Sequence, residues 1–120
     1  MCGFVVIEGD FDSSLTDTFK EDFKKLTHRG PDDHQLVVFP KGLIGFHRLA
    51  IMDLSDHGRQ PFESKKSNFL VCNGEIYNYL DLKAKCINHH FISHSDCEVL
   101  LPLYEQWGIK KMVESLDAEY

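Results

Sequence analysis

The sequence predicts a single α+β domain that extends over residues 1–120. Short stretches rich in β-branched and aromatic residues predict strands, and segments with apolar residues three or four positions apart predict helices. No repeat, low-complexity tract or linker divides the chain. At this length the chain can bury about 65% of the surface that it exposes when unfolded, which is enough for one hydrophobic core.

The composition is ordinary for a globular protein and excludes two classes of partner. Hydrophobic residues make up 42% of the chain, and 13 Lys and Arg against 19 Asp and Glu give a net charge of −6. A duplex nucleic-acid binder needs a basic surface to displace counterions, and docking on anionic lipids needs one too. We therefore expect no nucleic acid and no membrane among the partners.

The chain shows no signal for export or membrane insertion. Its longest apolar runs, such as Phe4–Ile7, have about four residues, far fewer than a membrane-spanning helix requires. Its start lacks the cationic region and uninterrupted apolar stretch of a signal peptide. We therefore expect a cytoplasmic protein with reduced thiols at its four cysteines, Cys2, Cys72, Cys86 and Cys97.

The first half of the chain predicts a strand, a helix and a hairpin. Residues 3–8 form a short apolar stretch that predicts a buried strand. Residues 35–39 and 43–47, joined by a turn that contains Pro and Gly, predict a β-hairpin. Between the first strand and this hairpin we expect an amphipathic helix with a Ser or Thr N-cap and a stop at Arg29-Gly30-Pro31. Its apolar face is formed by Leu15, Phe19, Phe23 and Leu26.

After the hairpin, the pattern predicts one more strand and then a short helix. Residues 69–72 predict a strand that ends at the turn-prone Asn73-Gly74. Residues 80–86 predict a short amphipathic helix, for which Asn78 is the expected N-cap. The predicted sheet therefore has few strands and open edges.

The last third of the chain is expected to be helical. Ser95-Asp96-Cys97-Glu98 has the form of a capping box, and the helix that it begins should reach Trp107. Pro102 removes one backbone bond and is expected to bend this helix. Gly108 should separate it from a final helix over residues 109–116, so that the chain ends just after a helix.

Cys2 directly follows the initiator methionine and is the first candidate catalytic residue. Removal of the methionine would leave Cys2 with a free α-amino group, whose pKa of about 7.7–8.0 allows it to act as a base near neutral pH. A thiol and a base on the same residue form a self-contained nucleophile. The alternative is that Cys2 is only a small packing residue at the start of a strand.

Six short blocks follow one another along the chain: Met1-Cys2-Gly3, His28-Arg29-Gly30-Pro31-Asp32, Phe46-His47-Arg48-Leu49-Ala50-Ile51-Met52-Asp53, Gln60-Pro61, Asn73-Gly74-Glu75-Ile76-Tyr77-Asn78 and Ser95-Asp96-Cys97-Glu98. In this order and approximate spacing they resemble the glutaminase domain of glutamine-hydrolysing asparagine synthetases. Those domains are class II glutamine amidotransferases of the N-terminal-nucleophile hydrolase group. The block that begins at His28 is assigned a structural role, a helix stop and a loop near the site.

The resemblance implies a fold that this chain would contain only in part. Glutaminase domains of this family are αββα sandwiches of two antiparallel sheets and are longer than 120 residues, so the sandwich would be incomplete at its C-terminus. In the family, a second domain uses ATP and Mg to convert aspartate to asparagine with the ammonia that the glutaminase releases. That domain is not expected in residues 1–120, and neither is a cofactor.

The resemblance also assigns the chemistry to three residues. Cys2 attacks the side-chain amide of glutamine and forms a γ-glutamyl thioester; ammonia leaves, and water then releases glutamate. The side-chain amide of Asn73 and the backbone N–H of Gly74 would hold the oxyanion that develops. Asn carries two N–H donors, and Gly allows a turn that points its amide at a ligand. The alternative is that Asn73-Gly74 is a plain turn.

Glutamine carries one charge of each sign at its α-carbon, and the resemblance assigns a residue to each. Arg48 suits the carboxylate through a bidentate pair, and Asp96 suits the ammonium. Their alternative roles are a surface ion pair for Arg48 and a helix-start carboxylate for Asp96. The rest of the pocket is assigned to backbone groups around Leu49, Ile51 and Met52, together with Glu75.

A cluster of histidines and cysteines provides a rival interpretation, a zinc site. Its spacing is not that of a standard zinc finger, and one member falls within a block matched to the glutaminase family. We therefore expect no metal. The cluster contains Cys86, His89, His90, His94 and Cys97.

Three hypotheses about function remain open. The first is the N-terminal portion of a glutamine-hydrolysing asparagine synthetase, with glutamine as substrate and a synthetase domain in cis. The second is a truncated remnant that binds glutamine or a partner without turnover. The third is a stand-alone glutaminase that supplies ammonia to a synthetase chain in trans.

Overall fold

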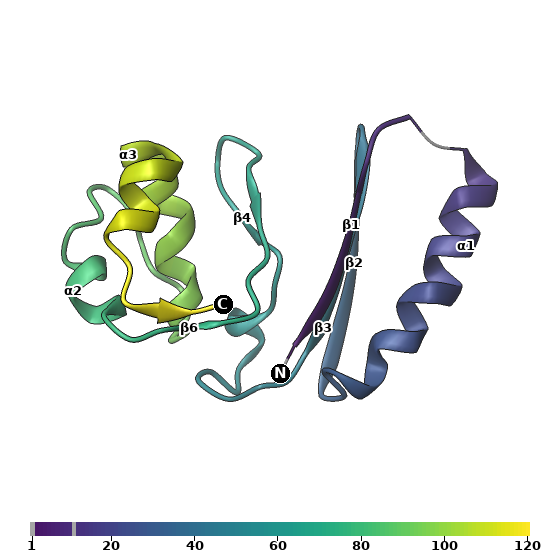
Figure 1. Cartoon of the computed structure of the whole chain (residues 1–120), viewed down its shortest axis with the longest axis horizontal. Coiled ribbons are helices and arrows are strands. Elements are labelled where there is room, and N and C mark those ends of the chain that lie inside the picture. Colours follow the sequence, from purple (N-terminus) through teal and green to yellow (C-terminus); the bar gives the residue numbers. More distant parts are fainter. Residues whose placement is uncertain (1, 11) are drawn as a thin grey trace.

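The computed structural model describes residues 2–10 and 12–120 as helices and short antiparallel sheets (Figure 1). The α+β class predicted from the sequence is confirmed. None of the helices in these residues is long and apolar enough to cross a membrane. The strands are β1 (Gly3–Glu8), β2 (Asp33–Phe39), β3 (Gly42–Arg48), β4 (Phe62–Glu63), β5 (Phe69–Leu70), β6 (Glu75–Ile76) and β7 (Ala118–Glu119). The α-helices are α1 (Ser13–Lys24), α2 (Tyr79–Lys83) and α3 (Leu100–Glu114), and 3₁₀ turns η1, η2 and η3 span Lys25–His28, Asp56–Gly58 and Asp96–Val99.

The first half forms a three-stranded antiparallel sheet with α1 packed on one face. The strand order is β1-β3-β2, so both neighbours cover the central β3, and all seven of its residues are buried. Phe19 and Phe23 of α1 pack against Leu43 of β3. The predicted strand, helix and hairpin are confirmed, and the two hairpin strands are slightly longer than predicted.

The start of α1 differs from the prediction. Its N-cap is Asp12 rather than a Ser or Thr, because an Asp12 Oδ1 atom accepts a hydrogen bond from Leu15 N at 3.0 Å. The Leu15 side chain remains 39% exposed, so the buried part of the apolar face begins one turn later, at Phe19. At its other end the helix tightens into the 3₁₀ turn η1 before it reaches Gly30.

The second half lies across the opposite face of the sheet from α1. In Figure 1 the order is α1, the three-stranded sheet, the β4–β5 ribbon, and then α2 with α3. The rings of Phe39 and Phe69 lie 5.6 Å apart and join β2 to β5. The helical part has its own core, formed by Ile76, Leu82, Val99, Leu100, Leu103 and Met112.

The end of the chain forms a strand, where the sequence led us to expect none. β7 pairs antiparallel with β6, with Glu119 opposite Glu75 and Ala118 opposite Ile76. Both strands have only two residues, and their apolar content is too low to give a strand signal. The pairing is decided by contacts between segments that lie far apart in the sequence, which a local pattern does not contain.

Two of the predicted helix caps, at Glu98 and at Asn78, do not form. The Ser95 hydroxyl accepts from Cys97 N at 3.3 Å, but the carboxylate of Glu98 accepts from Ile92 N and Ser93 N instead of closing a capping box. Asn78 lies at the N-cap position of α2, yet its side chain does not cap. It binds the far end of α3, donating to Ser115 O at 2.9 Å and accepting from Asp117 N at 3.1 Å.

The predicted break at Gly108 is confirmed, whereas the expected bend at Pro102 does not occur. Gly108 adopts φ 78° and ψ 168° inside α3, a backbone conformation that favours glycine and that kinks the helix. Pro102 falls in the first turn of α3, where a backbone N–H has no partner within the helix.

Candidate functional site

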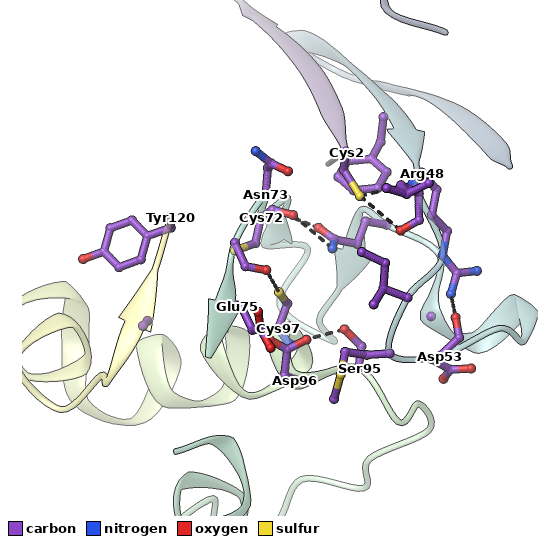
Figure 2. Close-up of a pocket in the computed structure, with 18 of the residues that line it drawn as sticks. Cys2, Arg48, Asp53, Cys72, Asn73, Glu75, Ser95, Asp96, Cys97 and Tyr120 are labelled. Carbon is purple, nitrogen blue, oxygen red and sulfur yellow. Dashed lines mark hydrogen bonds between the residues drawn. The ribbon is translucent and has the colours of Figure 1, made fainter. Parts of the chain in front are cut away.

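A pocket of about 820 Å³ opens between the sheet and the helical part of the chain (Figure 2). It lies where β1 begins and β3 ends, next to the segments that precede β6 and α3. All nine residues that the sequence assigns to a glutamine site line it: Cys2, Arg48, Leu49, Ile51, Met52, Asn73, Gly74, Glu75 and Asp96. Residues that are up to about ninety positions apart in the sequence therefore share one cavity.

Cys2 is held at one end of the pocket by the pairing of β1 with β3. The next residue, Gly3, lies opposite His47, which brings the Cys2 thiol beside the segment that follows β3. Leu49 N donates to Cys2 Sγ at 3.3 Å, and the thiol donates to Leu49 O at 3.7 Å. The thiol is therefore fixed and half-buried within the lining. The proposed removal of Met1 lies outside the described residues.

The block from His28 to Asp32 braces the segment that faces Cys2, as the sequence predicts. A Cβ atom on Gly30 would lie 2.6 Å from the carbonyl carbon of Arg48, so only glycine allows the two backbones to approach this closely. Asp32 N donates to Arg48 O at 3.1 Å, and the Asp32 carboxylate accepts from Ala50 N at 2.8 Å.

Arg48 is a buried cation, with only 7% of its surface exposed. Its guanidinium donates to the backbone carbonyl of Ser55 at 2.8 Å and to that of Asp53. Both partners are neutral, so these bonds fix the group in place without neutralising its charge. The alternative of a surface ion pair is wrong.

Asp96 carries the opposite charge on another side of the pocket (Figure 2). It is 4% exposed and lies in the first turn of η3. One carboxylate oxygen accepts from Ile76 N at 2.7 Å, which joins η3 to β6. The position is both a helix start and part of the pocket lining, so the two roles considered for Asp96 do not exclude one another.

Asn73 and Gly74 lie in the connection from β5 to β6. Gly74 O accepts a hydrogen bond from the Cys97 thiol at 3.8 Å, and a Cβ atom on Gly74 would lie 2.7 Å from Tyr120 Cβ. A larger residue would push β7 away, which explains glycine here. β5 and β6 belong to different sheets, so Asn73-Gly74 does not join the two strands of a hairpin.

Other residues that the sequence did not assign to the glutamine site also line the pocket, among them Asp53, Gln60, Cys72 and Cys97. The Gln60 side chain pairs with the backbone of Cys72, accepting from its N–H at 2.6 Å and donating to its carbonyl at 3.2 Å. Contact with Cys97 lowers the pKa of the Cys72 thiol, and contact with Cys72 together with burial raises the pKa of Cys97. Gln60 and Asp53 belong to matched blocks, which was their only signal in the sequence.

The rival zinc site does not form in the part of the chain that the structure describes. No group of three or more His, Cys, Asp and Glu side chains there is arranged to hold a metal ion. His89 lies 3.3 Å from a Glu98 oxygen, and the Cys86 thiol donates to Leu82 O on its own helix.

Comparison with known proteins identifies the family to which the chain belongs. Residues 1–120 match the glutamine amidotransferase domain along their whole length, and the chain belongs to that family. Its similar relatives are glutamine-hydrolysing asparagine synthetases. It is 47% identical over 100 residues to a probable enzyme of this name from Acanthamoeba polyphaga mimivirus, which covers 80% of this chain and 18% of the relative.

Two cellular relatives agree with this comparison. Asparagine synthetase [glutamine-hydrolyzing] 2 of Bacillus subtilis (strain 168) is 48% identical over 85 residues, 70% of this chain and 11% of the relative. The protein of the same name from Oryza sativa subsp. japonica is 36% identical over 122 aligned positions, which cover 100% of this chain and 20% of the relative. The resemblance inferred from the six blocks is confirmed, and the chain spans about a fifth or less of the length of these relatives.

Proposed function

We propose that the chain hydrolyses glutamine to glutamate and ammonia through a thioester on Cys2. The observation that carries this proposal is the convergence of nine residues from separate segments on one pocket, with a thiol, a buried cation and a buried carboxylate in its lining. These are the three groups that an enzyme needs to attack the amide of a free amino acid and to hold its two charged ends.

In this mechanism the Cys2 sulfur attacks the amide carbon of the glutamine side chain. The carbon–sulfur bond forms as the carbonyl oxygen takes up negative charge, which Asn73 and the N–H of Gly74 stabilise. The carbon–nitrogen bond then breaks, and the nitrogen leaves as ammonia with a proton passed through the α-amino group of Cys2. Water adds to the thioester, releases glutamate and returns the proton to the thiol.

The two buried charges would select for a free amino acid. Arg48 would bind the α-carboxylate and Asp96 the α-ammonium, with Glu75 and the backbone of Leu49, Ile51 and Met52 completing the lining. Because both side chains are more than nine-tenths buried, each charge would be poorly compensated without a ligand of the opposite sign.

We further propose that residues 1–120 are part of a glutaminase domain whose complete form is an αββα sandwich. The layer order of α1, sheet, ribbon and helices supports this proposal (Figure 1). In the whole protein the ammonia would pass to a synthetase domain, in cis or in trans, which would use ATP and Mg to convert aspartate to asparagine in the cytoplasm. No residue of this chain is assigned to that step or to a cofactor.

Two other functions remain as alternatives. In the first, the chain binds glutamine or a partner without turnover, because the sheet exposes apolar residues such as Phe4 (43%) and Val6 (48%) that a complete domain would be expected to cover. In the second, it is a stand-alone glutaminase for a separate amidotransferase chain. Glutamine binding without glutamate formation favours the first alternative. Release of free ammonia at full rate without any synthetase favours the second.

The decisive experiment measures the intact mass of the purified chain after exposure to an electrophilic glutamine analogue. We expect loss of the Met1 mass and one adduct, which glutamine prevents and which is absent from Cys2→Ala. Cys86→Ala is the matched control, because Cys86 lies outside the pocket lining and burial raises the pKa of its thiol. Cys72→Ala tests the second pocket thiol as the nucleophile.

The outcomes separate the proposal from its alternatives. Steady glutamate production that Cys2→Ala abolishes supports the proposal. An adduct that survives in Cys2→Ala and disappears in Cys72→Ala contradicts it, because the nucleophile would then be Cys72. A retained Met1 together with turnover would exclude the α-amino group as the base.

A further inference from the structure

The loop from Ile51 to Leu54 buries its charged residue and exposes its apolar residues. The apolar side chains of Ile51 and Leu54 are 72% and 81% exposed, and Met52 is 44% exposed, whereas Asp53 between them is only 6% exposed. Burial of a carboxylate is costly unless hydrogen bonds compensate for the lost water. A loop that buries its charged residue and exposes its apolar ones is therefore organised around that carboxylate.

Both oxygens of the Asp53 carboxylate accept hydrogen bonds, and together they join two distant parts of the chain. One oxygen accepts from Ser55 N at 2.8 Å and from Ser55 Oγ at 2.7 Å. The other oxygen accepts from His94 N at 2.8 Å, across 41 positions of sequence. The same residue also holds Arg48, because its backbone carbonyl accepts from the Arg48 guanidinium.

These contacts place Asp53 between the two charged groups of the pocket. Arg48 is the last residue of β3, in the sheet, and Asp96 begins η3, in the helical part. Asp53 binds Arg48 through its carbonyl and His94, two residues before Asp96, through its carboxylate. Asp53 therefore connects the guanidinium of Arg48 to the segment that carries Asp96.

The neighbouring turn leaves little freedom for this arrangement. A Cβ atom on Gly58 would lie 2.9 Å from Asp53 Cβ and closer than 3.0 Å to a terminal nitrogen of Arg48. The guanidinium is thus enclosed by η2 on one side and held by the carbonyls of Asp53 and Ser55 on the other. Packing and hydrogen bonds agree in fixing where the positive charge sits.

We propose that Asp53 is a positioning residue that sets the spacing between Arg48 and Asp96, and so makes the pocket selective for a ligand with a carboxylate and an ammonium on one carbon. This inference rests on the proposed function, because it takes Arg48 and Asp96 as the groups that bind the α-carboxylate and α-ammonium of glutamine. Asp53 itself touches neither group of the ligand; it acts through the two residues that do.

The test compares two substrates in Asp53→Asn. Asn is nearly isosteric, but its NH₂ group would face either the Ser55 donors or His94 N. The substitution therefore removes the hydrogen bonds of Asp53 to one of these two residues. Glutaminase kcat and KM are measured for L-glutamine and for 4-carbamoylbutanoate, which has the same carboxylate and amide but no α-ammonium. The matched control is Asp56→Asn, the same change on an exposed side chain three residues away.

We expect Asp53→Asn to raise KM for L-glutamine at least about tenfold with little change in kcat. The KM for 4-carbamoylbutanoate should change much less, because that ligand binds Arg48 alone and is insensitive to the spacing. Asp56→Asn should leave both values unchanged. Ser55→Ala, which removes one donor to Asp53 and no charge, should shift the preference in the same direction by a smaller factor.

Other results would overturn the inference. Equal losses for both substrates in a folded Asp53→Asn protein would show a general structural role, and unchanged values would show no role. If the unaltered chain binds L-glutamine without turnover, calorimetric dissociation constants for the same two ligands replace KM. If the unaltered chain neither binds nor hydrolyses glutamine, the proposed function itself fails. If only Asp53→Asn loses binding or activity, the proposed function is not affected. Should Asp53→Asn not fold, an unchanged preference in Ser55→Ala refutes the inference.

Discussion

Gln60 provides the sharpest prediction about how the pocket is built. Its side-chain amide is buried, accepts from Cys72 N at 2.6 Å and donates to Cys72 O at 3.2 Å. The Gln60 amide therefore pairs with the backbone N–H and C=O of Cys72, as a neighbouring strand would, and Cys72 immediately precedes Asn73. We predict that Gln60→Ala destabilises the fold and loosens the segment that would carry the oxyanion donors.

The expected magnitude follows from the groups that the substitution leaves without partners. A buried backbone donor or acceptor that loses its only partner costs about 1–3 kcal/mol. Cys72 is half-buried, so water can replace part of each bond, and the two groups together should cost about 2–4 kcal/mol. That is a large fraction of the total stability of a domain of this size, about 5–15 kcal/mol.

Gln106 is a matched control, because its side chain makes the same pair of bonds on the surface. Its amide donates to Lys85 O at 3.1 Å and accepts from Ile87 N at 3.0 Å, both in an exposed setting. Water can take over both bonds, so Gln106→Ala should cost about 1 kcal/mol or less. The difference between the two variants then measures the effect of burial on identical chemistry.

The assay is urea unfolding of the three proteins at 25 °C, followed by circular dichroism and analysed as a two-state transition. Gln60→Ala should also lower kcat for glutaminase more than it raises KM, because Asn73 and Gly74 would act on the transition state. Equal destabilisation by the two substitutions would refute the reasoning from burial. An unchanged kcat in a destabilised Gln60→Ala protein would refute the link to Asn73.

Three further predictions concern the supports of the site. Gly30→Ala should cost about 1–3 kcal/mol in urea unfolding, because its methyl group would clash with the backbone of Arg48; an unchanged midpoint would contradict this close approach. Burial alone would raise the pKa of Asp53, but hydrogen bonds from Ser55 and His94 N lower it to about 2, against an ordinary value of 3.8. As the pH falls, the carboxyl group of the unfolded chain therefore takes up its proton before that of the folded chain. About 2 kcal/mol of folding free energy should be present above pH 4 and be lost as the pH falls to about 2. This dependence of stability on pH should be missing from Asp53→Asn. Glu98→Gln should cost about 2 kcal/mol in thermal unfolding, because its new NH₂ group would face the N–H donors of Ile92 or Ser93; retention of the melting temperature would count against this.

The elements that the sequence predicts correctly are those with a strong local signal. Residues 3–8 and the hairpin are short β-branched stretches between turn residues, and α1 repeats its apolar residues at helical spacing. Gly108 broke the last helix as expected, because glycine tolerates the positive φ that interrupts a helix. In each case the signal lies within a few neighbouring residues.

Two of the errors occur where a side chain binds a partner other than the local one that its position predicts. Glu98 has the position of a capping-box carboxylate but binds the loop of Ile92 and Ser93. Asn78 has the position of an N-cap but binds Ser115 O and Asp117 N. Local capping is worth about 1 kcal/mol, so a pair of tertiary hydrogen bonds is enough to override it.

The candidate site shows the same division. The identities of its chemical groups, the thiol of Cys2, the guanidinium of Arg48 and the carboxylate of Asp96, were available from the sequence because they stand in recognisable blocks. The blocks alone fixed neither their common pocket nor the groups that hold them. Gln60 and Asp53 act by bonding to backbone, and a side chain that binds backbone leaves no pattern in its partner's sequence.

The sequence by itself therefore determined the class of the fold, the family and the candidate residues of the site, because all three depend on local patterns and on residue identity. Only the tertiary structure decided that β7 pairs with β6, that Asp53 is buried between exposed apolar neighbours, and that the Arg48 guanidinium donates to the backbone carbonyls of Asp53 and Ser55. The strand pairing and the burial of Asp53 depend on contacts between segments more than 40 positions apart, and the Arg48 bonds depend on how the loop after β3 folds back. Their free energies decide between alternatives that local propensity leaves nearly equal.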